Sequence, residues 1–194
     1  MSKDFRLRAV FSVLAVAMAS LALASTAGAS QGGGVVIQSR DACDPATFPP
    51  GFCVRTDNSG GLVTIGELLA SLQQKGSHPA WGFTKDKLTV KRGTPVVAEF
   101  GRGGEVHSFT DVTTTGFGPG CIDVINRAEF GDPATAPACG PDPIAGLGVI
   151  LGTPDKPESG LFPGVPKTID TSRPGTRLFQ CMLHPWMRTT LTVE

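Results

Sequence analysis

The pattern of apolar positions contains one clear helix signal. Four apolar residues recur at the spacing of a single helix face: Ile65, Leu68, Leu69 and Leu72. Thr64 and Glu67 have the spacing of a capping box, and Gly76 stands where a C-terminal cap belongs. We therefore expect a short amphipathic helix between Thr64 and Gly76.

From residue 81 onward the pattern changes to short apolar runs separated by turn residues. These runs predict strands at 81–84, 88–91, 95–100, 107–112, 167–171, 176–181 and 188–193, with a possible earlier strand at 35–38. Many short strands between Gly and Pro residues are typical of an antiparallel sandwich or barrel. Residues 113–162 lack this period and are rich in glycine and proline. We interpret them as a long insertion, with one possible short helix near 122–128.

The first 29 residues have the pattern of an export signal. Basic residues precede an apolar run over 9–24, and Ala27-Gly28-Ala29 offers a cleavage motif. The run is shorter than the roughly 18 residues of a spanning helix, so we expect no spanning segment after cleavage. The expected organisation is a signal peptide at 1–29, an N-terminal extension at 30–80 and a domain at 81–194. The expected location is periplasmic, extracellular or on the cell surface.

Charge and motifs exclude several classes of function. The chain has 17 Lys and Arg against 17 Asp and Glu, which excludes nucleic-acid binding through bulk positive charge. Its 3 histidines exclude a centre that needs many imidazoles. The sequence has no G-x-S-x-G, H-E-x-x-H or paired C-x-x-C motif. It therefore gives no support for a hydrolase or for a structural zinc site.

The 5 cysteines gain meaning from the expected export, because an oxidising compartment lets thiols pair. Cys43 and Cys53 flank one proline-rich loop, while Cys121 and Cys139 flank another. Four cysteines allow about three pairings, of which we favour Cys43–Cys53 and Cys121–Cys139. Cys181 is then unpaired, and a lone thiol in an exported protein needs a partner chain or a ligand.

A soft donor set lies at the predicted turn between the last two strands. Cys181, His184 and Met187 fall within one short segment there. With a second imidazole, they would form a His₂Cys site with a weak axial Met, which suits copper. His107, at the start of another predicted strand, can supply that imidazole. Taken singly, each residue also has a common structural role, and Glu105, two positions before His107, would give a harder, non-blue site as a ligand.

The residues that carry this chemistry resemble a known family. The segment from Cys181 to Glu194 resembles the end of a cupredoxin, a small type 1 blue-copper protein of the amicyanin and plastocyanin kind. Residues 83–96 resemble the strand, turn and strand that lead to the first ligand of the family. The resemblance implies an all-β, Greek-key β-sandwich that binds one copper ion through four residues: His107, Cys181, His184 and Met187.

Three features depart from the pattern of the family. His107 and Cys181 are separated by 74 positions, because the insertion stands between them. Val106 precedes His107 where the family often has proline. Gly101 occupies the position, six before His107, where an asparagine commonly tethers the ligand loop.

The resemblance implies a monomeric one-electron carrier, and not an enzyme, that exchanges electrons with a redox partner protein. We expect Leu183, Pro185 and Trp186 to form an apolar electron-exit patch around His184, although Trp186 would serve equally as a core residue. Two other functions remain open. One is copper storage or delivery, and the other is an envelope or cell-surface interaction module whose binding surface is the insertion at 113–162.

Overall fold

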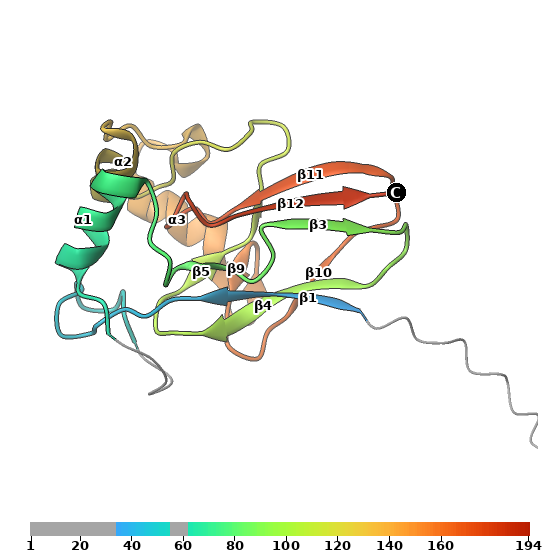
Figure 1. Cartoon of the computed structure of the whole chain (residues 1–194), viewed down its shortest axis with the longest axis horizontal. Coiled ribbons are helices and arrows are strands. Elements are labelled where there is room, and N and C mark those ends of the chain that lie inside the picture. Colours follow the sequence, from blue (N-terminus) through green and yellow to red (C-terminus); the bar gives the residue numbers. More distant parts are fainter. Residues whose placement is uncertain (1–33, 55–61) are drawn as a thin grey trace, which may run out of the picture. The chain divides into compact units, whose positions relative to one another are not determined.

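The computed structural model of the protein describes residues 34–54 and 62–194, and the expected signal peptide at 1–29 lies outside them. These described residues belong to one compact unit. Their fold is all-β in its core: two four-stranded sheets form the sandwich, and three α-helices lie among the described residues (Figure 1).

The first sheet has the strand order β10–β4–β1–β2. Its strands are β10 (Lys167–Ile169), β4 (Val96–Arg102), β1 (Val35–Arg40) and β2 (Gly82–Phe83). β1 pairs in parallel with β4 and in antiparallel with β2, so it lies inside the sheet (Figure 1). The residues ahead of position 81 therefore contribute a strand to the sandwich itself.

A local irregularity in this sheet explains the glycine at position 101. The register of β1 and β4 shifts between Ser39 and Arg40. A Cβ atom on Gly101 would lie 2.3 Å from the carbonyl oxygen of Ser39. Only a glycine allows this close approach of the two backbones.

The second sheet has the strand order β3–β12–β11–β6. Its strands are β3 (Lys87–Val90), β12 (Arg188–Val193), β11 (Gly175–Gln180) and β6 (Thr110–Asp111). β11 and β12 are antiparallel neighbours, whereas β3 and β12 run in parallel. Each sheet thus contains one parallel pair where we expected antiparallel pairing, because long stretches of chain separate the two strands of each such pair.

The strand expected at 107–112 is divided between two sheets. β5 (His107–Ser108) pairs with β9 (Gly160–Leu161), and β6 joins the second sheet. Between them, the backbone N–H of the buried Phe109 donates to the carbonyl oxygen of Ser159 over 2.7 Å.

The core lies between the two sheets and contains a cluster of aromatic rings. Phe109 stacks on Phe179 of β11, with 4.4 Å between ring centroids. It meets Phe83 of β2 edge-on, with 5.0 Å between centroids. One side chain therefore contacts both sheets, and it does so directly after the strand that carries His107.

The helix expected from the sequence is confirmed as α1 (Ile65–Lys75). The side chain of Thr64 accepts the N–H of Glu67, and the Glu67 side chain accepts the N–H of Thr64, which completes the capping box. Gly76 ends the helix in the left-handed conformation. Leu68 and Leu72 are fully buried, as the apolar stripe predicts.

The insertion contains more regular structure than its composition suggests. α2 (Asp123–Phe130) corresponds to the short helix considered at 122–128, and a 3₁₀ helix, η1 (Pro137–Cys139), follows it. α3 (Pro143–Leu151) was not expected, although its start has the usual signals, an Asp142 cap followed by proline. β7 (Gly152–Thr153) and β8 (Lys156–Pro157) form a small antiparallel pair.

Two disulfides cross-link loops of the sandwich. One joins Cys43 to Cys53, and the other joins Cys121 to Cys139 across α2 and the 3₁₀ helix. Cys181 is the free cysteine of the described chain, and it is buried. The insertion is thus closed covalently beside the loop that follows β11, where the N–H of Cys121 donates to the Met182 carbonyl oxygen over 2.7 Å.

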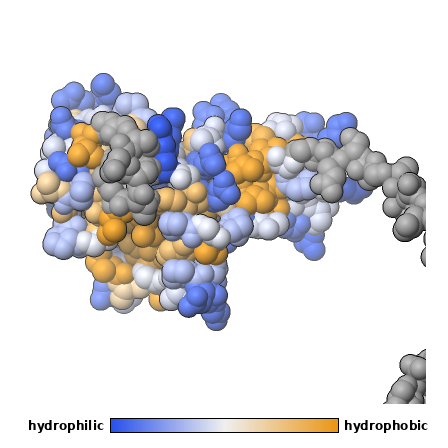
Figure 2. Space-filling model, turned by 90° about the horizontal axis from the view of Figure 1, so that it is seen from below, coloured by the Kyte–Doolittle hydropathy of each residue, from blue (hydrophilic) through white to orange (hydrophobic). Residues whose placement is uncertain are grey.

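The surface is mixed in character. Figure 2 shows apolar residues in several separate areas among hydrophilic ones. The large apolar side chains with the highest exposure are Val54 at 63%, Ile144 at 59% and Val149 at 75%. Among the described residues, none of the helices is both long and apolar enough to cross a membrane.

Candidate metal centre

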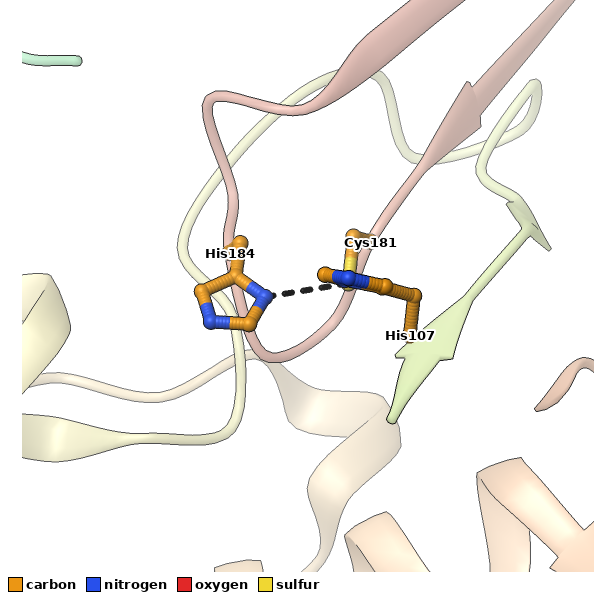
Figure 3. A group of neighbouring side chains, drawn as sticks. All are labelled: His107, Cys181 and His184. Atoms are coloured by element: carbon orange, nitrogen blue, oxygen red, sulfur yellow. Dashed lines mark hydrogen bonds between the residues drawn. The ribbon is translucent and has the colours of Figure 1, made fainter. Parts of the chain in front are cut away.

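Three of the four predicted ligands meet inside the protein. His107 comes from β5, Cys181 directly follows β11, and His184 lies in the loop between β11 and β12. The Sγ atom of Cys181 is 3.7 Å from Nδ1 of His184 and 4.0 Å from Nδ1 of His107. Figure 3 shows a nitrogen of the His184 ring directed at the sulfur of Cys181, and the ring of His107 next to the same sulfur. All three side chains are buried.

The spacing of these atoms fits a single bound ion. One donor atom from each residue lies within 4.8 Å of the other two. Three donors in a plane around one ion, with bonds of about 2.0 Å to nitrogen and about 2.3 Å to sulfur, would be separated by roughly 3.5–3.7 Å. The two nitrogen–sulfur distances need to shorten only slightly to reach that arrangement. Two imidazoles and one thiolate also form a soft donor set of the kind that copper prefers.

The ligand loop is closed by its own backbone. The N–H of Cys181 donates to the carbonyl oxygen of Met187 over 3.0 Å, and the N–H of Met187 donates to that of His184 over 2.8 Å. Met187 is 1% exposed. Pro185 lies between these anchored positions and restricts the loop further, because its ring fixes φ. The backbone therefore keeps the spacing of Cys181, His184 and Met187 short and constant.

Ser108 joins the ligand loop to the strand of His107. Its Oγ atom accepts the N–H of Met182 over 2.8 Å, and its own N–H points at Sγ of Cys181 over 3.4 Å. A tether between the two ligand-bearing segments is thus present, although position 101, where the resemblance leads us to expect an asparagine, holds a glycine. It comes from the residue after His107 instead.

Two buried carboxylates lie behind the histidines, and the sequence analysis missed the role of both. Nε2 of His107 is 2.9 Å from Oδ2 of Asp41, and both side chains are 0% exposed. Nε2 of His184 is 3.4 Å from Oε2 of Glu105, and these side chains are 4% exposed. Glu105 therefore faces the outer edge of His184, on the side of the ring away from Cys181.

These neighbours shift the pKa values of the metal-free site. Burial opposes a charge on either imidazole, but the hydrogen bond to Asp41 and the interactions with Cys181 raise the pKa of His107 to about 9. In the same way, Glu105 and Cys181 outweigh burial and raise the pKa of His184 to about 10. Burial alone would raise the pKa of the Cys181 thiol, whereas hydrogen bonds from both histidines hold it well below its usual value. The site is therefore prepared for a thiolate, the form that binds metals.

Trp186 packs against His184 of the centre. Its ring meets that of His184 edge-on, with 5.2 Å between centroids. Of the expected electron-exit patch, Leu183 and Pro185 are buried and Trp186 is half-buried. Nε1 of Trp186 and Oε2 of Glu129 are buried and have no hydrogen-bond partner among the described residues.

An apolar pocket of about 150 Å³ opens beside the centre. Leu183, His184 and Glu105 form part of its wall. The rest comes from the Cys43–Cys53 loop, α1 and the insertion, in particular Phe48, Phe52, Ile65, Leu68, Ile125 and Ile144. Apolar side chains from three segments of the chain therefore surround the approach to His184.

Comparisons with known proteins found matches among solved structures only. No family model and no curated protein matches the chain. Among solved structures, an oxidised plastocyanin from Dryopteris crassirhizoma is 21% identical, covers 59% of this chain and 89% of its own, and has a TM-score of 0.31.

Two further solved structures are similar to about the same extent. A reduced auracyanin from the photosynthetic bacterium Roseiflexus castenholzii is 19% identical, covers 58% of this chain and 87% of its own, and has a TM-score of 0.30. A reduced mutant of amicyanin is 18% identical, covers 56% and 70%, and has a TM-score of 0.28. All three solved structures are cupredoxins, the family that this sequence resembles.

Proposed function

We propose that this protein is an exported, monomeric type 1 copper protein that carries one electron at a time and is not an enzyme. The observation that carries the proposal is the buried group of His107, Cys181 and His184, with its sulfur 3.7 Å and 4.0 Å from the two Nδ1 atoms. Met187, buried in the same loop, would be the weak axial ligand. A bound copper ion would supply the change between the Cu(I) and Cu(II) states.

In this function, the role of the protein is to keep the positions of the ligand residues fixed. An electron passes quickly when the ligand geometry changes little between oxidation states. The hydrogen bonds that close the loop from Cys181 to Met187, and the tether from Ser108 to Met182, restrict such changes. Burial of all three donor residues also keeps water away from the ion.

Burial favours an electron carrier over copper storage or delivery. A delivery protein must release its ion, which requires an accessible ligand or an open face. His107 and Cys181 are 0% exposed and His184 is 3% exposed. Their arrangement supports long retention of the ion and exchange of electrons only.

We further propose that the redox partner docks at the half-buried Trp186, which packs on His184 beside the buried Leu183 and Pro185. The two disulfides support a location in an oxidising compartment, either the periplasm or the cell exterior. The same proposal includes the expected organisation of the chain, with a signal peptide at 1–29, an extension at 30–80 and a domain at 81–194. β1, which lies in the extension, is a strand of the first sheet.

Spectroscopy after addition of Cu(II) tests the function. We expect an intense visible absorption band and the narrow copper hyperfine splitting of a thiolate-bound ion. The Cys181→Ser variant should be colourless. A colourless unsubstituted protein, or one with an ordinary tetragonal copper signal, would contradict the proposal.

A further inference from the structure

Each imidazole of the candidate centre has a dedicated carboxylate on the ring edge away from the sulfur. Asp41 lies 2.9 Å from Nε2 of His107, and Glu105 lies 3.4 Å from Nε2 of His184. In both rings, Nδ1 is the nitrogen nearest to Cys181. A carboxylate at Nε2 keeps a proton on that nitrogen, and this leaves the Nδ1 lone pair available for an ion.

The backbone holds Asp41 in place for this contact. Its Oδ1 atom accepts the N–H groups of Cys43 at 3.3 Å and Gly104 at 2.9 Å, while Oδ2 accepts that of Glu105 at 3.2 Å. A Cβ atom on Gly103 would lie 2.1 Å from Oδ2, so only a glycine fits beside the carboxylate. These contacts hold the Asp41 carboxylate in a single position against His107.

Glu105 is supported differently. The indole N–H of Trp81 donates to its Oε2 atom, the same atom that faces Nε2 of His184. Trp81 is 3% exposed and stacks on Phe48 of the Cys43–Cys53 loop, with 6.2 Å between centroids. An oxygen that accepts an indole N–H and lies 3.4 Å from an imidazole nitrogen fits a carboxylate in its charged form.

We propose that Asp41 and Glu105 are positioning residues that orient the two histidine ligands and favour the oxidised state of the ion. This inference rests on the proposed function. The charge balance explains the direction of the effect. One thiolate and two carboxylates already outweigh the charge of Cu(II), and reduction to Cu(I) leaves a further negative charge uncompensated. In a buried site of low dielectric constant, that excess is costly.

The two carboxylates contribute unequally. Asp41 is nearer to its histidine, is completely buried and accepts three backbone N–H groups, whereas Glu105 lies 0.5 Å farther from its own. We therefore expect the larger effect from Asp41. Both residues come from outside the ligand loop, so the tuning depends on contacts made by β1 and by the segment before β5.

The test compares the copper-loaded full chain with Asp41→Asn and Glu105→Gln, which keep the side-chain size and remove the charge. We expect both variants to have a more positive reduction potential. We also expect the dissociation constant of Cu(II) to rise by about 10–100-fold, with a smaller change for Cu(I). Asp111→Asn is the control, because Asp111 is 40% exposed and pairs with Arg177 and not with a histidine of the centre.

Trp81→Phe separates charge from general damage to the site. It removes an N–H donor from Glu105 and leaves the carboxylate, so the negative charge is less compensated and the potential should fall. A purely structural disturbance would not lower the reduction potential in Trp81→Phe and raise it in the two amide variants. In the diamagnetic Cu(I) protein, nitrogen–proton spectra should show slowly exchanging Nε2 protons on His107 and His184, and each signal should be lost or shifted in the corresponding amide variant.

The outcomes distinguish this inference from the function on which it rests. Unchanged potentials in both amide variants, with normal colour, would overturn the positioning role and leave the electron carrier intact. An equal loss of affinity for Cu(I) and Cu(II) would also overturn it. Absence of the visible band from the unsubstituted protein would instead refute the proposed function.

Discussion

The backbone N–H of Met182 donates to Ser108 Oγ over 2.8 Å, and this bond joins the residue after Cys181 to the residue after His107. The ligand loop joins β11 to β12 of the second sheet, whereas β5 pairs with β9, so the bond holds together two segments that pair with different strands. Thr110 Oγ1 donates to the same hydroxyl over 3.0 Å, which orients it.

Ser108→Ala should destabilise the metal-free protein. The buried Met182 N–H loses its acceptor, and an unsatisfied buried donor costs about 1–3 kcal/mol. Denaturant unfolding measures the change. Ser77→Ala, at an exposed serine, should change the free energy of unfolding by less than about 0.5 kcal/mol. Equal stability of the two variants would contradict the importance of the tether.

Gly120→Ala should displace the ligand loop. Its Cβ atom would lie 2.4 Å from the Met182 carbonyl oxygen and 2.8 Å from Cγ of Pro185. Overpacking of this kind costs about 1–3 kcal/mol, and the altered loop should shift the visible band of the copper-loaded protein. Gly118→Ala is a matched control, because a Cβ atom there would have nothing within 4 Å. If both variants keep the native spectrum and stability, the contact does not constrain the loop.

Glu129 should make stability depend on pH. Burial raises its pKa to about 7, although Arg188 acts in the opposite direction from 3.2 Å. Between about pH 4.5 and pH 7 the unfolded chain loses the Glu129 proton while the folded protein keeps it, so stability falls as pH rises. Above pH 7 the penalty is constant.

The variant Glu129→Gln lacks this titration. Relative to the unsubstituted protein, it should gain stability on the order of 1 kcal/mol between pH 4 and pH 8. The gain is modest because Arg188, 3.2 Å away, offsets part of the cost of burying the Glu129 charge. Thermal unfolding at a series of pH values measures the gain. Parallel pH profiles for the two proteins would show that Glu129 does not titrate in this range.

Copper uptake should release protons at neutral pH. In the metal-free protein the pKa of His107 is about 9 and that of His184 about 10, so both rings are protonated at pH 7. An ion must replace the Nδ1 protons, so the apparent affinity for Cu(II) should increase as pH rises towards 9. Calorimetry in two buffers with different protonation enthalpies should count about two protons per ion. An affinity that does not change between about pH 6 and about pH 8 would contradict the expectation.

Elements with signals in their own sequence could be predicted, whereas features that depend on residues far apart in the chain could not. The helix from Ile65 and the final strand, Arg188–Val193, have caps or periodic apolar positions within their own sequence, and the structure places them where expected. The break at Phe109 depends on Ser159, fifty positions later, and no local pattern indicates it.

The same distinction applies to the candidate centre. Cys181, His184 and Met187 share one short loop, so their spacing reveals them. Asp41 reaches His107 only because β1 pairs with β4, and Glu105 reaches His184 through the tertiary contact of two loops. Carboxylates that act behind a ligand have no fixed spacing in sequence, so the sequence alone could not identify them.

The parallel pairing of β1 with β4 also determines when the centre can exist. It brings Asp41 to a cluster that contains Cys181, which follows it by 140 positions in the chain. A nascent or partly translocated polypeptide that has not yet reached Cys181 and His184 cannot assemble this pocket. An ion could therefore be bound only after the strands from β1 to β11 and the ligand loop have come together.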